Sequence, residues 1–173
     1  MKFFTRGWIY GGWEKAVVVA YREHVARLSP HLPPDVQALT QTNLHDGLIR
    51  RLVLDRKAAT LLMELRCGDL CVGYFDLDLL YQQATLTPAD VEALSVLALN
   101  RARGSEFLYD EVDMEENGFF CHRILAIESS RESPLHEVAI IFKGLTLTRT
   151  PRENRKFGWR KRRFIEIGAT SNG

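Results

Sequence analysis

Apolar residues recur at helical spacing near the start of the chain. From Trp8 to Leu28 they fall every three or four residues, with Trp13 on the apolar stripe, which predicts one amphipathic helix. Thr5 is placed to cap its first turn. The prolines that begin at position 30 end this helix, because proline lacks the amide donor, and Pro34 suits the first turn of a short helix over Asp35–Leu39.

From Leu44 the apolar spacing shortens towards two, the period of a half-buried strand. Turn signals at Asp55–Lys57 and Cys67–Asp69 separate three predicted strands, which are Leu44–Leu54, Ala59–Arg66 and Leu70–Leu80. We expect these strands to form an antiparallel meander. Thr87 then caps a helix that has Pro88 at its first position and an acidic residue, Asp90, in its first turn.

Three more strands are predicted beyond residue 104: Glu106–Val112, Phe119–Ile127 and Glu137–Thr148. Asn117-Gly118 marks a hairpin between the first two, because both residues accept positive φ. The pattern predicts an α+β fold, with an N-terminal helix or helices and one middle helix packed on a largely antiparallel sheet of about six strands. We expect a single domain over residues 1–148 and a basic, aromatic-containing strand or tail over residues 149–173.

Composition narrows the class of protein without naming its activity. The 173 residues are 46% hydrophobic and 26% charged, which argues against disorder, collagen and a coiled coil. The longest apolar runs are far shorter than the roughly 18 to 20 residues that span a bilayer, and the opening residues lack the uninterrupted apolar core of a signal peptide. We therefore expect a cytoplasmic protein without membrane contact.

The near-neutral net charge of +1 conceals two regions of opposite charge. Residues 1–148 carry 15 lysines and arginines against 20 aspartates and glutamates, whereas residues 149–163 carry eight basic residues against Glu153 alone. An acidic body and a basic C-terminal segment are thus joined in one chain.

The acidic residues suggest a surface for a partner protein. Asp76 and Asp78 alternate on one predicted strand, and three more candidates crowd the later hairpin, namely Asp110, Glu111 and Asp113. Their combined charge would attract a basic surface, either on another protein or on this chain's own tail. The alternative is that these acidic residues only face solvent, on an exposed strand face and in an acidic turn, and bind no partner.

The C-terminal segment supports a second hypothesis, nucleic-acid binding. Its cations could contact phosphates while an aromatic ring stacks on unpaired bases, and the candidate residues are Arg155, Lys156, Trp159, Arg160, Lys161, Arg162 and Arg163. The alternative that we favour is a last strand, Trp159–Ile167, whose apolar side chains dock on the sheet while its cations face water or the acidic body.

Catalytic and metal-binding patterns are weak. His45 and Asp46 are adjacent, as in some metal-dependent phosphohydrolases, but further ligands on helices would be needed, so a turn-capping role is favoured. Cys67, Cys71 and Cys121 with the neighbouring His122 contain zinc-donor types, yet consecutive residues on a strand point to opposite faces, which favours buried thiols. No nucleophile elbow or phosphate loop is present. We lean against an enzyme and expect no cofactor.

Short stretches of the sequence resemble a group of small uncharacterised bacterial proteins. The likeness rests on the opening MKFFT, on Leu44–Gly47 leading into a strand, and on Phe107–Val112 followed by a strand that contains a histidine. Some similar domains occur beside immunity genes of polymorphic toxins. The resemblance implies a bacterial protein-binding domain with an immunity or accessory role, and homo-oligomers are possible.

Overall fold

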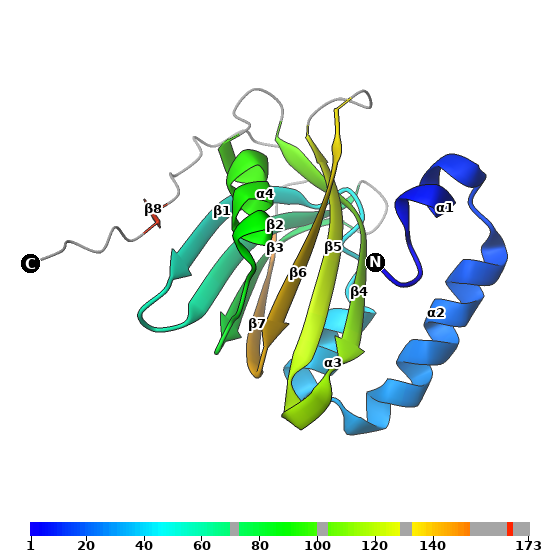
Figure 1. Cartoon of the computed structure of the whole chain (residues 1–173), viewed down its shortest axis with the longest axis horizontal. Coiled ribbons are helices and arrows are strands. Elements are labelled where there is room, and N and C mark those ends of the chain that lie inside the picture. Colours follow the sequence, from blue (N-terminus) through cyan, green and yellow to red (C-terminus); the bar gives the residue numbers. More distant parts are fainter. Residues whose placement is uncertain (70–72, 100–103, 129–132, 153–165, 168–173) are drawn as a thin grey trace, which may run out of the picture.

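Helices lead the chain and strands dominate the rest in the computed structural model, which describes residues 1–69, 73–99, 104–128, 133–152 and 166–167 (Figure 1). The described α-helices are α1 (Arg6–Gly11), α2 (Lys15–Leu28), α3 (Pro34–Gln41) and α4 (Pro88–Leu99), with 3-10 turns at Ser29–His31 and Glu116–Gly118. The described strands are β1 (Leu48–Asp55), β2 (Thr60–Asp69), β3 (Gly73–Gln82), β4 (Ser105–Met114), β5 (Phe120–Glu128), β6 (Leu135–Phe142), β7 (Gly144–Pro151) and β8 (Glu166–Ile167). The α+β prediction is confirmed, and the main antiparallel sheet has seven described strands rather than six.

The predicted first helix is in fact two helices. Thr5 caps α1 as expected, since its hydroxyl accepts a hydrogen bond from the Trp8 amide at 3.2 Å. The helix then stops at Gly12, which has φ of 114°, and Trp13 follows with φ of 61°. Two consecutive glycines weaken the helix here, and Gly12 adopts the left-handed conformation that ends it. The prediction that Trp13 belongs to a buried helical stripe is therefore wrong.

The sheet curls because its two terminal strands are neighbours in sequence. The strand order is β6-β5-β4-β1-β2-β3-β7, so the predicted strand Glu137–Thr148 is really two strands at opposite ends of the order. Lys143 alone separates them, and its amide bonds to the Gln82 carbonyl at 3.0 Å. The prediction of a single strand is wrong, and its break brings the ends of the sheet together at one corner (Figure 1).

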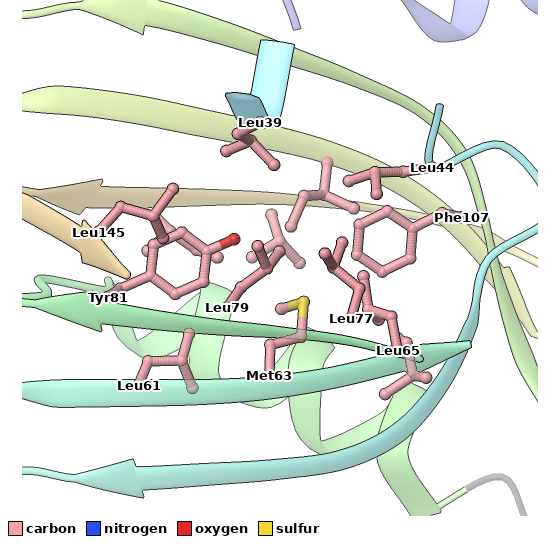
Figure 2. Packing of buried hydrophobic residues seen from close by; sticks show 14 of the residues in the cluster. Leu39, Leu44, Leu61, Met63, Leu65, Leu77, Leu79, Tyr81, Phe107 and Leu145 are labelled. Carbon is pink, nitrogen blue, oxygen red and sulfur yellow. The ribbon is translucent and has the colours of Figure 1, made fainter. Parts of the chain in front are cut away.

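The concave side of the curled sheet holds the core. Alternate residues of β2 and β3 point inward with Phe107 of β4, and α3 contributes Leu39 from the side (Figure 2). The intervening residues of these strands, which include Glu64 and Asp78, therefore lie on the convex outer face.

The helix α4 is fixed to the sheet through its first turn. Thr87 and Asp90 form the predicted capping pair, in which the Thr87 amide donates to the Asp90 carboxylate at 2.9 Å. The same carboxylate accepts the amide of Ala139 on β6 at 2.9 Å. None of the described helices is long and apolar enough to cross a membrane.

Candidate partner-binding site

Glu111 anchors the N-terminal segment. Its side chain is only 2% exposed, and its carboxylate accepts the backbone amides of Lys2, Phe3 and Phe4 at 2.7, 2.7 and 2.6 Å. A carboxylate that accepts several amide bonds is well compensated for burial. Glu111 thus ties the first residues to β4, and a partner cannot reach it while that segment is in place.

Asp113 is also enclosed on β4. Lys2 contacts its carboxylate through Nζ, and His24 and Arg123 lie 3.3 and 3.5 Å from it. Burial alone would raise the pKa of Asp113, but the hydrogen bond and charge of Lys2 outweigh it, so the pKa lies below its usual value. Two of the five predicted acidic residues, Glu111 and Asp113, are therefore buried and do not contribute to an exposed acidic surface.

Asp110 belongs to a buried chain of hydrogen bonds with His122 and Tyr81, which the sequence pattern did not predict. The imidazole of His122 is fully buried, with Nε2 3.1 Å from Asp110 and Nδ1 2.7 Å from the hydroxyl of Tyr81. Burial raises the pKa of Tyr81 well above its usual value, and the charge of Asp110 adds to this. A carboxylate can only accept, so His122 donates to Asp110 from Nε2, and a neutral imidazole then accepts at Nδ1 from the Tyr81 hydroxyl, which keeps its proton.

Asp76 and Asp78 lie on the outer face of β3, where their surroundings differ. Asp76 is flanked by three guanidinium groups, from Arg66 at 3.0 Å, Arg50 at 3.1 Å and Arg152 at 3.5 Å. Although burial opposes the shift, these cations lower the pKa of Asp76. Asp78 is exposed, and its pKa is raised by partial burial and by the charges of nearby carboxylates. Only Asp78 thus remains an accessible acid of the kind that the partner-binding hypothesis requires.

His45 and Asp46 do not form a metal site with any other described residues. His45 Nδ1 donates to the Leu108 carbonyl at 2.5 Å, and its Nε2 is 3.6 Å from the Asp46 carboxylate, too far for a hydrogen bond. Within the described part of the chain, no group of three or more histidine, cysteine, aspartate or glutamate side chains could hold a metal ion. The geometry thus offers no support for the metal-dependent hydrolase.

The same pair instead lies beside a group of partly exposed aromatic rings, which we call the aromatic surface and define as Trp13, His45, Asp46 and Tyr109. The Tyr109 ring is central, with centroids 5.2 Å from His45 and 5.7 Å from Trp13. Trp13 is 54% exposed and the Asp46 side chain 68%. Burial and the charge of Asp46 raise the pKa of Tyr109. Large aromatic rings beside an accessible carboxylate are thus gathered on one surface.

The backbone of the aromatic surface is unusual at two points. Trp13 and Asp46 have φ of 61° and 59°, a conformation that costs a bulky residue about 1 kcal/mol or more. Trp8, which is buried, supports Trp13 from below, since its ring centroid lies 5.6 Å away and its Nε1 donates to the Glu14 carbonyl at 3.1 Å. The fold thus holds Trp13 half-exposed to solvent with a strained backbone, and backbone strain of this kind is typical of binding sites.

The sequence contains one signal for this surface. Gly11-Gly12 is a helix stop, and recognising it would have removed Trp13 from the buried stripe. Nothing in the sequence could place Tyr109 beside Trp13, because the contact joins residues almost a hundred positions apart.

Two cysteines are buried, free thiols. Burial raises the pKa of Cys67 to about 12 and that of Cys121 to about 11, so both stay protonated and unreactive at neutral pH. Cys71 lies outside the described residues.

The candidate nucleic-acid residues also lie outside the described part of the chain. They are Arg155, Lys156, Trp159, Arg160, Lys161, Arg162 and Arg163. Of the flanking segments, β7 continues to Pro151, and β8 pairs in parallel with β1 through Val53 and Leu54.

Comparison with known proteins identifies a family. No curated protein and no solved structure matches the chain significantly. A family model described as protein of unknown function (DUF4085) matches residues 10–142, a range that runs from α1 to the last residue of β6. The chain therefore belongs to the DUF4085 family of proteins of unknown function.

Proposed function

We propose that this protein is a non-enzymatic domain that binds another protein through the aromatic surface. The observation that carries the proposal is the 54% exposure of Trp13, held at positive φ against the ring of Tyr109. Tryptophan and tyrosine are the residues most enriched among those that dominate binding energy at protein interfaces. A rigid, preformed ring also loses little conformational entropy when a partner covers it.

Charge indicates the chemistry of the partner. The exposed carboxylate of Asp46 is close enough to Tyr109 to raise its pKa, and the half-exposed ring of Trp13 is electron-rich and therefore attracts a cation. An arginine or lysine side chain of the partner would satisfy both groups. We infer an immunity or accessory role in the bacterial cytoplasm, in keeping with the resemblance noted in the sequence, and no cofactor is required for it.

Substitution of Trp13 by glycine tests the proposal. Glycine suits the positive φ at this position, so Trp13→Gly removes the ring without adding backbone strain. Full-length protein would be used to capture a partner from the cells that express it, and the purified partner would then be titrated calorimetrically. We expect an equimolar complex that Trp13→Gly weakens by about 30-fold or more, since residues of this kind contribute about 2 kcal/mol or more.

The matched control is Leu99→Ala, which removes another exposed apolar side chain, on α4 and outside the aromatic surface. It should leave the affinity unchanged. A partner that binds the Trp13→Gly and wild-type proteins equally, or failure to recover any stoichiometric partner, would refute the proposal. Recovery of a second copy of this chain alone would replace it with homo-oligomer formation.

A further inference from the structure

The chain itself caps one end of the main sheet. The terminal strand β6 pairs with β5 on one side, and its other edge meets residues outside the sheet. Ile141 exchanges two backbone hydrogen bonds with Thr85, at 2.7 and 3.1 Å. The Ala139 amide donates to the Asp90 carboxylate at 2.9 Å. Backbone groups that another strand would pair with are thus already occupied along β6.

The other end of the strand order, β7, has an edge without such caps. β7 pairs with β3 in unbroken antiparallel register, and the Arg152 amide just beyond it donates to the Tyr74 carbonyl at 3.0 Å. In an antiparallel pair, residues bonded to the neighbouring strand alternate with residues whose N–H and C=O point away from it. This alternation places the backbone groups of Leu145, Leu147 and Arg149 on the outer edge. Within the described part of the chain, nothing forms a hydrogen bond with these groups.

The surroundings of β7 are consistent with an accessible edge. The helix α3 contacts β7 from the inner side, where Leu39 and Leu145 belong to the core (Figure 2). Thr146 and Thr148 are exposed. Pro151 ends the strand, and the alternation would direct its missing N–H away from β3, a position where a sheet tolerates proline. An uncapped edge of this kind is a template for a further strand.

The edge of β7 is complementary to itself. If a second copy lies antiparallel with Leu147 opposite Leu147, then Leu145 lies opposite Arg149 on both sides of a two-fold axis. This register pairs all the outward N–H and C=O groups of the three residues. On the outer face it sets Thr146 beside Thr148 of the second copy, a favourable cross-strand pair.

Charge favours the same register. The two Arg149 residues are then offset by four residues along the strands, roughly 14 Å, which exceeds the Debye length of about 8 Å in physiological salt. Moving the two-fold axis to Arg149 would instead place the like charges directly opposite each other, which destabilises a strand pair. A second copy centred on Leu147 therefore meets no opposed like charge.

We propose that two copies of this chain pair through the outer edge of β7 around Leu147, so that their sheets join into one continuous sheet. The residues that define the aromatic surface lie outside β7, so the dimer carries two such surfaces. A partner with repeated binding sites would then bind the dimer more tightly than one copy, because its second contact is intramolecular.

Sedimentation equilibrium of the full-length chain tests the proposal, and wild type should show a reversible dimer. Arg149→Pro removes an N–H that points away from β3, so it blocks the edge and leaves the pairing with β3 in place. We expect the dimer dissociation constant to rise by at least about ten-fold, because each copy loses a hydrogen bond and meets the proline ring.

The matched control is Arg149→Ala, which keeps the N–H and should dimerise at least as tightly as wild type. Trp13→Gly, which alters the aromatic surface, should also leave the dimer unchanged and so separates this proposal from the proposed function. A wild-type chain that stays monomeric, equal dimerisation of Arg149→Pro and wild type, or loss of the dimer in Trp13→Gly would overturn the proposal.

Cross-linking that depends on register gives a second test, with substitutions only at exposed threonines. Positions 146 and 148 of the two copies are direct neighbours in a non-hydrogen-bonded pair, close enough for a disulfide. Thr146→Cys and Thr148→Cys proteins, mixed and mildly oxidised, should form a covalent dimer in which peptide mapping finds positions 146 and 148 linked. In a control mixture of Thr148→Cys and Thr150→Cys the substituted positions are not opposite and should not link. Absence of the first link, or equal linking in the control, would overturn the proposed pairing.

Discussion

Replacing Tyr81 by phenylalanine should destabilise the protein through His122. The hydroxyl of Tyr81 lies 2.7 Å from Nδ1 of His122, and neither side chain is exposed to solvent. Phenylalanine fills the same space but leaves Nδ1 buried without a donor. A buried polar atom that loses its partner costs about 1–3 kcal/mol, and we expect a loss of that size in the free energy of unfolding.

Replacing both Tyr81 and His122 should lower the free energy of unfolding by less than the sum of the two single replacements. His122→Leu alone leaves the Tyr81 hydroxyl buried without an acceptor, which again costs about 1–3 kcal/mol. In Tyr81→Phe/His122→Leu neither polar atom remains, and Asp110 reaches water because its side chain is 17% exposed. The double variant should therefore lose about as much stability as one single variant, which corresponds to a coupling energy of about 1–3 kcal/mol.

Urea unfolding of the four proteins at pH 7 measures these differences, provided that the denaturant dependence of the unfolding free energy is the same for all. Tyr10→Phe is the matched control, since it removes a hydroxyl from a tyrosine that is 76% exposed and should change nothing. A Tyr81→Phe protein within 0.5 kcal/mol of wild type, or strictly additive losses in the double variant, would refute this account of the buried chain.

Three further predictions concern anchors seen in the structure. Glu111→Gln should lower the unfolding free energy by about 2–3 kcal/mol and speed proteolysis near the N-terminus, because a neutral amide accepts hydrogen bonds from three backbone donors poorly. An unchanged unfolding free energy together with an unchanged proteolysis rate would contradict this. Asp90→Ala should cost about 1–3 kcal/mol in thermal or urea unfolding, since it removes the cap of α4 and the acceptor for Ala139; a loss below 0.5 kcal/mol would speak against it. The pKa values of Asp76 and Asp113 are lowered in the folded state, so the stability that their ionised forms contribute should be complete above about pH 4 and should be lost as the pH falls through the folded pKa values. Asp76→Asn should therefore reduce the fall in the free energy of unfolding at acid pH, and an unchanged fall would show that Asp76 does not contribute to it.

The sequence by itself determined the local elements. Asn117 and Gly118 have φ of 60° and 73°, as the predicted turn requires, and Thr87 caps α4 as its spacing to Asp90 indicates. Each of these features involves residues within a few positions of one another, so a short stretch of sequence is enough to predict it. The period-two pattern likewise located the strands of the meander, because it reflects which side chains face the core.

Only the tertiary structure decided the role of the charged and aromatic residues. Glu111 resembles any exposed acid in sequence, and its burial follows from amide donors over a hundred positions away. Lys143-Gly144 interrupts the apolar alternation, but only the pairing of β6 and β7 with two different strands shows that they lie at opposite ends of the strand order. Trp13 and Tyr109 meet for the same reason, through long-range packing that local propensity does not encode. The physical reason is that the burial and hydrogen bonding of a side chain depend on its neighbours in space, and the curled sheet determines which residues become neighbours.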